Sequence, residues 1–302
     1  MPAETECAPD SESHTMDRRH FLATALVASQ SRAAAPSLTF GFSLYGMKVL
    51  KTDEALRTLA KIGYDTAELC LLPGYDAEPK NLTREQRHSL AKSPMRITAL
   101  MENLSLADTD QSKNHDRLKA AFQLSNDLPC SPLIETVMGN GEWDKVKTMF
   151  RDRLGEWAKL AQSAKCVLAV KPHRFGAVNR PDQVLWLLDQ INNPALKVVY
   201  DWSHLIHRDF QLEATIKQLS AVTAFVHVKD TVIVKEKAEF RLPGDTKDID
   251  YPLMLKSLLR VGYSGDVCCE VSGMLHTKPD YDAVRAAERC YNNLAPAFAK
   301  AK

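Results

Sequence analysis

The chain of 302 residues has no apolar run long enough to cross a membrane, which takes about 20 residues. It has no block of Lys and Arg, which argues against nucleic-acid binding. Its seven cysteines show no Cys-x-x-Cys spacing, so a structural zinc site is not expected. Internal repeats, low-complexity tracts and a Gly-rich phosphate loop are also missing. What remains is the composition of an ordinary globular protein, 45% hydrophobic and 25% charged.

The N-terminus predicts an export signal. Arg18 and Arg19 precede a short apolar run at 21–28 and an alanine cluster at 33–35, the layout of a twin-arginine signal peptide. Residues 1–35 are therefore expected to be a tail and signal, with Met16 favoured as the start, and the protein to be periplasmic or exported. A basic, frayed N-terminus is the alternative.

Residues 36–302 alternate between strand-like and helix-like segments. Helix starts are indicated at Thr83, Asn179 and Asp250. Cys70, Cys166, Cys268 and Cys269 lie in strand-like runs, where unpaired, buried thiols are expected. Eight strand–helix units predict a single (β/α)8 TIM barrel. The predicted strands are Leu38–Leu44, Thr66–Leu71, Arg96–Met101, Leu133–Met138, Cys166–Lys171, Val198–Tyr200, Ala224–Lys229 and Asp266–Val271.

Four of these strands carry a charged or imidazole side chain at or close to their carboxyl ends: Lys171, Asp201, His227 and Glu270. Their separations of 30, 26 and 43 residues suit one strand–loop–helix unit each, so the four groups should meet at the carboxyl-end rim of the barrel. That rim is where TIM barrels place their chemistry.

Alternation along a strand sharpens the prediction, because side chains two residues apart share a face. Each of the four groups therefore shares a face with the residue two positions before it. The pairs are Lys171 with Ala169, Asp201 with Val199, His227 with Phe225, and Glu270 with Cys268. If these faces line the barrel, an ammonium, two carboxylates and an imidazole converge. Asp, His and Glu are ligands for a divalent cation. The alternative is a set of buried salt bridges.

The segments VVYDWSH, FVHVKD and CCEVSG, in this order and spacing, resemble the xylose isomerase-like barrels of sugar phosphate isomerases and epimerases, from about Phe40 to the C-terminus. The resemblance implies one divalent metal (Mn, Mg, Co or Zn) held by Glu, Asp, His and Glu. Asp201, His227 and Glu270 match the last three positions. The first is Lys171, and a protonated lysine cannot ligate a metal. We therefore expect metal binding to be weakened or absent.

Other residues are candidates near the same rim. Glu135, on the strand beside Lys171, is either the missing metal ligand or a salt-bridge partner of that lysine. His173 and His204 occupy positions that, in the resemblance, face either substrate hydroxyls or the groups that support the metal ligands. Arg174 and Arg241 are candidates for binding a carboxylate or a pair of hydroxyls, and Glu102 is a further substrate-binding candidate.

The resemblance implies isomerisation or epimerisation beside a carbonyl, with Glu270 as the base and Lys171 in the place of the second glutamate. Three arrangements are open. In the first, the metal persists on Asp201, His227 and Glu270, with or without Glu135, and Lys171 is a proton donor or an oxyanion partner. In the second, the ammonium fills the metal's position and the site is metal-free. In the third, Lys171 acts as a base or Schiff-base amine. A ring of acids would raise the pKa of the lysine, which ranks the third arrangement last.

The sequence thus predicts an exported sugar or keto-sugar isomerase or epimerase, or a related lyase. The alternative is a carbohydrate-binding barrel that lost catalysis when Glu became Lys171. A DNA-repair endonuclease of the same barrel type would need a His-rich three-zinc site, for which too few histidines are placed. The expected partner is a small carbohydrate, and a homo-oligomer is left open.

Overall fold

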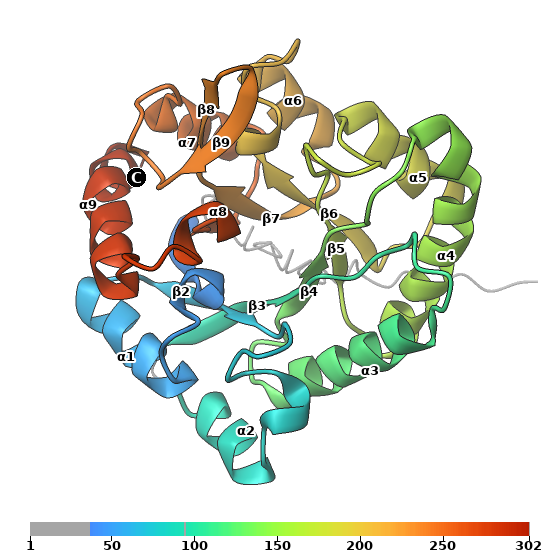
Figure 1. Cartoon of the computed structure of the whole chain (residues 1–302), viewed down its shortest axis with the longest axis horizontal. Coiled ribbons are helices and arrows are strands. Elements are labelled where there is room, and N and C mark those ends of the chain that lie inside the picture. The colour runs from blue at the N-terminus through green and yellow to red at the C-terminus, as the bar shows by residue number, and fades with distance from the viewer. Residues whose placement is uncertain (1–36, 94, 302) are drawn as a thin grey trace, which may run out of the picture. The chain divides into compact units, whose positions relative to one another are not determined.

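The computed structural model describes residues 37–93 and 95–301 and contains a closed barrel of eight parallel strands (Figure 1). The strands follow the order β1-β10-β7-β6-β5-β4-β3-β2, and β1 closes the ring against β2. The predicted fold, a single (β/α)8 TIM barrel, is confirmed. The barrel strands are β1 (Leu38–Ser43), β2 (Thr66–Cys70), β3 (Arg96–Glu102), β4 (Leu133–Thr136), β5 (Leu168–Val170), β6 (Leu196–Asp201), β7 (Thr223–Val228) and β10 (Gly265–Cys269).

Helices surround the barrel and bury the outer faces of its strands (Figure 1). The helices are α1 (Thr52–Ile62), α2 (Arg84–Ala91), α3 (Ser112–Asp127), α4 (Trp143–Ser163), α5 (Pro181–Ile191), α6 (Leu212–Leu219), α7 (Tyr251–Arg260), α8 (Gly273–His276) and α9 (Ala283–Ala301). Three single turns of 3-10 helix, η1 (Leu44–Met47), η2 (Pro79–Asn81) and η3 (Trp202–His204), follow β1, precede α2 and follow β6.

The inner face of the barrel is the one that alternation predicted. A separate small core cluster contains Ala99, Ala169, Val199, Phe225 and Cys268. Four of these residues lie two positions before the four strand-end groups, so those groups extend the same inward-facing rows toward the carboxyl-end rim.

Two of the three predicted helix starts are confirmed. Thr83 and Gln86 form a reciprocal capping box at α2, and the Asp250 carboxylate accepts the Leu253 N–H at the start of α7. The prediction for Asn179 is wrong. Its side chain is held by neighbouring loop groups, and α5 begins after Arg180 with a proline in its first turn and no side-chain cap.

A β-hairpin after β7 was not predicted from the sequence. Strands β8 (Asp230–Val234) and β9 (Lys237–Arg241) pair antiparallel over the barrel rim (Figure 1). The turn consists of Lys235 and Glu236, with φ of 46° and 64°. Two-residue hairpin turns of this kind favour Asn-Gly, so a Lys-Glu turn carries no sequence signal.

The expected signal peptide lies outside the described residues. Four cysteines were predicted to be buried and unpaired, and the structure confirms both properties for Cys70, Cys166, Cys268 and Cys269. Within residues 37–93 and 95–301, no helix has the length and apolarity needed to cross a membrane.

Candidate active site at the barrel mouth

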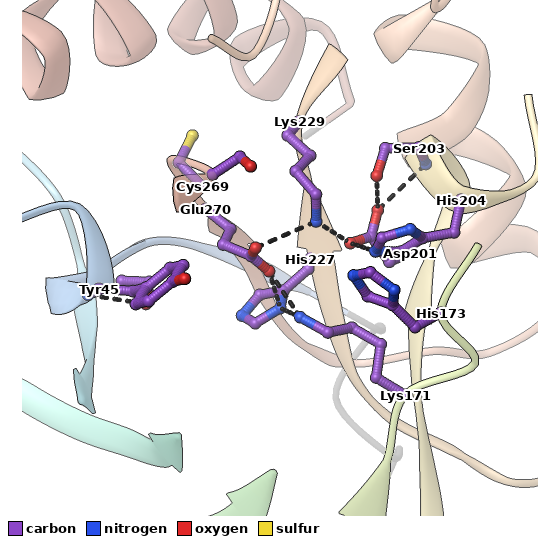
Figure 2. Close-up of polar contacts among 12 residues, drawn as sticks. Tyr45, Lys171, His173, Asp201, Ser203, His204, His227, Lys229, Cys269 and Glu270 are labelled. Carbon is purple, nitrogen blue, oxygen red and sulfur yellow. Dashed lines mark hydrogen bonds and ion pairs between the residues drawn. The ribbon is translucent and has the colours of Figure 1, made fainter. Parts of the chain in front are cut away.

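Seven buried ionisable side chains meet at the carboxyl ends of the barrel strands (Figure 2 shows five of them). We call them the rim cluster. Its members come from, or directly follow, six different strands, so only the closed barrel brings them together. They are Glu68, Glu135, Lys171, Asp201, His227, Lys229 and Glu270.

Lys171 directly follows β5 and contacts three other members of the cluster. Its Nζ lies 2.6 Å from Glu270 Oε2, 2.9 Å from His227 Nδ1 and 3.6 Å from Glu135 Oε1. Burial lowers the pKa of Lys171, but the carboxylates of Glu135 and Glu270 outweigh burial and raise it overall, so the side chain is an ammonium.

Lys229 directly follows β7 and contacts two other members of the cluster. Its Nζ donates to Asp201 Oδ2 at 2.5 Å and lies 3.2 Å from Glu270 Oε1. Figure 2 shows the two lysines reaching Glu270 from opposite sides. Lys229 was missed as a site residue, although the alternation rule could have found it, because it stands two positions after His227.

His227 links the two sides of the barrel through both ring nitrogens. Its Nε2 lies 3.0 Å from Glu68 Oε2, and its Nδ1 lies 3.0 Å from Glu270 Oε2. Burial lowers the pKa of His227, whereas Glu68 and Glu135 raise it, to about 9 overall. The charged ring donates to both carboxylates. Lys171 Nζ lies 2.9 Å from Nδ1, so two cations, the imidazolium and the ammonium, contact the same oxygen, Glu270 Oε2.

The two carboxylates bound by the lysines are ionised. Burial alone would raise the pKa of Asp201 and of Glu270. Lys229 and His204 reverse this at Asp201, and Lys171 and Lys229 reverse it at Glu270, so that both pKa values lie well below their usual range. Asp201 Oδ1 also accepts from the N–H and the hydroxyl of Ser203, at 3.0 and 2.6 Å.

A cavity of about 560 Å³ opens onto part of the rim cluster. Lys171, Glu270 and Glu135 line it, together with Tyr45 and Glu102, whereas Lys229 is not among its lining residues. A volume of this size lies within the range of small-molecule binding sites. The polar groups on its walls make it the candidate substrate site.

The carboxyl groups on the β3 and β4 side of the cavity differ from those bound by the lysines. Burial raises the pKa of Glu102 to about 7 despite its ion pair with Arg117. Burial likewise raises the pKa of Glu135 to about 7 against the opposing effect of Lys171. Glu102 Oε1 and Glu135 Oε2 are buried without a hydrogen-bond partner. These carboxyls can hold or release a proton near neutral pH.

The structure brings some of the predicted substrate-binding residues to the cavity and not others. His173 lines it and packs on His204, with ring centroids 4.1 Å apart. Burial and the neighbouring His204 lower the pKa of His173 to about 2. Burial and Lys229 lower the pKa of His204 to about 4, so both rings are neutral. Arg174 instead donates to the carbonyl of Ile206. Arg241 lies on β9, paired with Glu239 at 2.8 Å, and is not a lining residue of the cavity.

The candidate metal ligands are close together but already bonded. The ligating atoms of Asp201, His227 and Glu270 lie within 4.8 Å of one another, which is a metal-like grouping. Both oxygens of each carboxylate and both nitrogens of the imidazole, however, have partners among Lys171, Lys229, Ser203 and Glu68. A divalent ion would have to displace an ammonium, so this arrangement of residues does not fit one.

The xylose isomerase-like TIM barrel family model matches residues 56–292, which include every member of the rim cluster. A comparison with curated protein sequences finds no match. The family match thus rests on a sequence pattern, whereas the likeness to individual proteins rests on structure alone.

Solved structures share the fold at low identity. A xylose isomerase-like barrel fused to a 4-hydroxyphenylpyruvate dioxygenase has a TM-score of 0.69 and 20% identity over 86% of this chain, which spans only 42% of that longer protein. The IOLI protein with a bound zinc atom has a TM-score of 0.70 and 19% identity, covering 87% and 99% of the two chains. D-allulose 3-epimerase from Methylomonas sp. in complex with D-allulose has a TM-score of 0.64 and 13% identity, covering 87% and 98%.

Proposed function

Because the chain belongs to the xylose isomerase-like TIM barrel family, we propose that it is an isomerase or epimerase of sugars or keto-sugars, or a related lyase. The observation that carries the proposal is the Lys171–Glu270 pair, an ammonium and a carboxylate 2.6 Å apart that line the cavity. The similarity to a sugar epimerase that binds D-allulose supports the substrate class.

In the proposed reaction Glu270 removes a proton from the carbon beside the substrate carbonyl. The electron pair of the C–H bond forms a C=C bond, and the π pair of the carbonyl moves to its oxygen. Lys171 donates a hydrogen bond to that oxygen, where the negative charge develops. Glu270 is ionised at neutral pH, and a carbonyl oxygen that takes over a hydrogen bond from Lys171 releases the carboxylate for its role as base.

The second proton transfer needs a group that carries a proton near neutral pH. Glu135 meets this condition, because its pKa is about 7 and its Oε2 has no hydrogen-bond partner. Return of a proton to the same carbon from the other face, with the carbonyl re-formed, gives epimerisation. In isomerisation the former carbonyl carbon takes up the proton, while the hydroxyl on the deprotonated carbon passes its proton to the enolate oxygen and becomes the new carbonyl. In the lyase reaction the carbonyl re-forms, the C=C pair shifts by one carbon, and the hydroxyl beyond it leaves as water with the proton of Glu135.

Substrate binding is assigned to groups that can pair with hydroxyls. His173 is neutral, so one ring nitrogen donates and the other accepts. Glu102, with its free Oε1, is a second hydroxyl partner on the cavity wall. Arg174 and Arg241 have protein partners and are not needed in this scheme.

A panel of keto-sugars and keto-glycosides tests the proposal. Wild-type protein should convert at least one of them, with exchange of the transferred hydrogen in D₂O detected by NMR. Solvent exchange distinguishes proton transfer from hydride transfer.

The second candidate function is a carbohydrate-binding barrel without turnover. It is favoured by the two ammonium groups that bind both oxygens of Glu270 and leave no free base in the unliganded site. Micromolar binding of a sugar by calorimetry, with no conversion and no hydrogen exchange, would establish this function instead of the first.

The proposed location is the periplasm or beyond, reached by the twin-arginine route, and the motivation is Arg18-Arg19 ahead of an apolar run. Changing both arginines to lysine should leave the precursor in the cytoplasm, as seen by cell fractionation and immunoblotting. Wild-type protein found in the cytoplasm with residues 1–35 intact would refute the signal.

A further inference from the structure

We propose that the ammonium of Lys171 occupies the place of the divalent metal that the family resemblance implies, and that the site works without a metal. The inference deepens the proposed function, on which its chemical meaning rests. It depends on the positions of atoms in the rim cluster and on the charges they carry.

The first observation is the gap that Lys171 fills. Its Nζ lies 2.6 Å from Glu270 Oε2 and 2.9 Å from His227 Nδ1, and these two atoms lie 3.0 Å apart. A metal bound by the same two atoms would stand about 2.0–2.2 Å from each. The ammonium therefore stands in the gap that two of the three candidate ligands would offer an ion.

The second observation is that Lys229 closes the other side. It bridges Asp201 Oδ2 and Glu270 Oε1, at 2.5 and 3.2 Å, the two carboxylates that would complete a metal site. The remaining Asp201 oxygen is held by Ser203. Two of the three pairs of candidate ligands are thus already joined by a lysine ammonium: Glu270 and His227 by Lys171, and Asp201 and Glu270 by Lys229.

The third observation is the balance of charge. Four buried carboxyl groups, Glu68, Glu135, Asp201 and Glu270, face three nitrogen groups, Lys171, Lys229 and His227. Every one of the four carboxyls lies within 4.0 Å of at least one of the three nitrogen groups. Buried charges are tolerated when they are paired in this way, and a dication would add two positive charges to a set in which each carboxyl group already has a nitrogen partner.

The position also explains what the lysine can do. Lys171 lines the cavity, so the hydrogen bond that it donates to Glu270 can pass to a substrate oxygen. A fixed ammonium in a water-poor site stabilises a developing oxyanion, which is the role a metal ion plays as a Lewis acid. Lys171 is accordingly a catalytic electrophile within the proposed function.

Metal binding by the purified mature chain tests the proposal without any need for turnover. Wild type, Lys171→Glu and Lys171→Met are dialysed against Mn²⁺ or Zn²⁺, rinsed, and analysed for metal, and thermal unfolding is followed with each ion or with EDTA. Lys159→Glu, at an exposed site on α4, controls for the change of net charge. The expected contrast is substoichiometric metal in the wild type and about one equivalent in Lys171→Glu, with an affinity at least ~100-fold higher.

Thermal unfolding shows whether each variant is folded, so the test still works if one variant folds poorly. Lys171→Glu should be destabilised in EDTA and recover in Mn²⁺, because bound metal stabilises the folded state. Lys171→Met, which removes the ammonium without adding a carboxylate, should gain weak metal binding through the three remaining ligands. Stoichiometric metal in the wild type would overturn the proposal, and so would failure of both variants to bind more metal than the wild type.

These outcomes are separate from those of the proposed function. A wild type without metal, paired with a Lys171→Glu variant that binds it, supports the substitution even if no sugar is turned over. If a substrate is found, EDTA should leave wild-type turnover within about 2-fold, because no step passes through an ion.

Discussion

Lys171 and Lys229 reach the same carboxylate from two sides, yet their surroundings differ. Lys171 lines the cavity and has Glu135 as a second carboxyl partner, whose pKa is about 7. Lys229 is covered by Phe240 of β9, whose ring centroid lies 5.1 Å from Nζ, and its second partner is Asp201. One ammonium is open to a ligand, and the other is sealed under the hairpin.

The difference separates a chemical role from a structural one. Loss of Lys171 would leave Glu270 with Lys229, and Glu135 can take up a proton near neutral pH. Loss of Lys229 would leave Asp201 Oδ2 only His204, 3.4 Å away and neutral. We therefore propose a chemical role for the Lys171 side of the rim cluster and a stabilising role for the Lys229 side.

The largest expected effect is the loss of turnover in Glu270→Gln, the partner shared by both lysines. The amide keeps the volume but cannot accept a proton, so kcat should fall by about 10³-fold or more. Steady-state kinetics on the active sugar measures it, with circular dichroism to show retained folding. Glu288→Gln, exposed on α9, should behave as wild type. An unchanged kcat in Glu270→Gln would exclude it as the base and end the contrast between the lysines.

The next effect is on stability. Lys229→Met should lower the free energy of unfolding by about 3–5 kcal/mol at pH 7, because it leaves a buried carboxylate without its cation. Lys171→Met should lower the free energy of unfolding by less, about 1–2 kcal/mol, because Glu270 keeps its ion pair with Lys229 and Glu135 can become protonated. Urea titrations of both, with exposed Lys159→Met as control, decide the order. Equal losses would mean that the two lysines are equivalent supports.

The third prediction concerns pH. Burial raises the pKa of Glu135 from 4.5 to about 7, so between these values the folded chain keeps a proton that the unfolded chain has released. Stability contributed by this group therefore falls as pH rises from 4.5 to 7. Glu135→Gln cannot titrate, and its loss of stability between about pH 5 and 7.5 should be smaller than in the wild type, by about 1–3 kcal/mol. Identical pH profiles would show that Glu135 is ionised throughout.

The sequence predicted the barrel and the inward faces because both depend on short-range periodicity. A period of two residues fixes the face of Lys171, Asp201, His227 and Glu270 once the strands are recognised, and the unit spacing places all four at one rim. Their catalytic and metal-binding roles stay predictions.

What escaped prediction depends on contacts between distant segments. Glu68 lies 159 residues from His227, and nothing local to either residue indicates that they pair. The β8–β9 hairpin, which covers Lys229, has a turn without the usual residues, so the difference between the two lysines could not be foreseen. Arg241, a substrate-binding candidate, lies on β9, where its guanidinium pairs with Glu239, and its role stays a prediction.

The smallest expected effect is that of His204→Ala, which sharpens the boundary between binding and chemistry. His204 is buried, is not a lining residue of the cavity, and supports the cavity residue His173 through ring packing at 4.1 Å. Its Nδ1 also accepts the Arg174 N–H at 3.3 Å. Removal of the ring should leave His173 less firmly held. KM should therefore rise about 10-fold while kcat stays within about 3-fold of wild type, and the 10-fold rise corresponds to about 1.4 kcal/mol in kcat/KM. His88→Ala, at an exposed position on α2, provides the matched control. If kcat fell as far as kcat/KM with KM unchanged, His204 would act in the chemical step through Asp201, and the sealed side of the rim cluster would be catalytic as well.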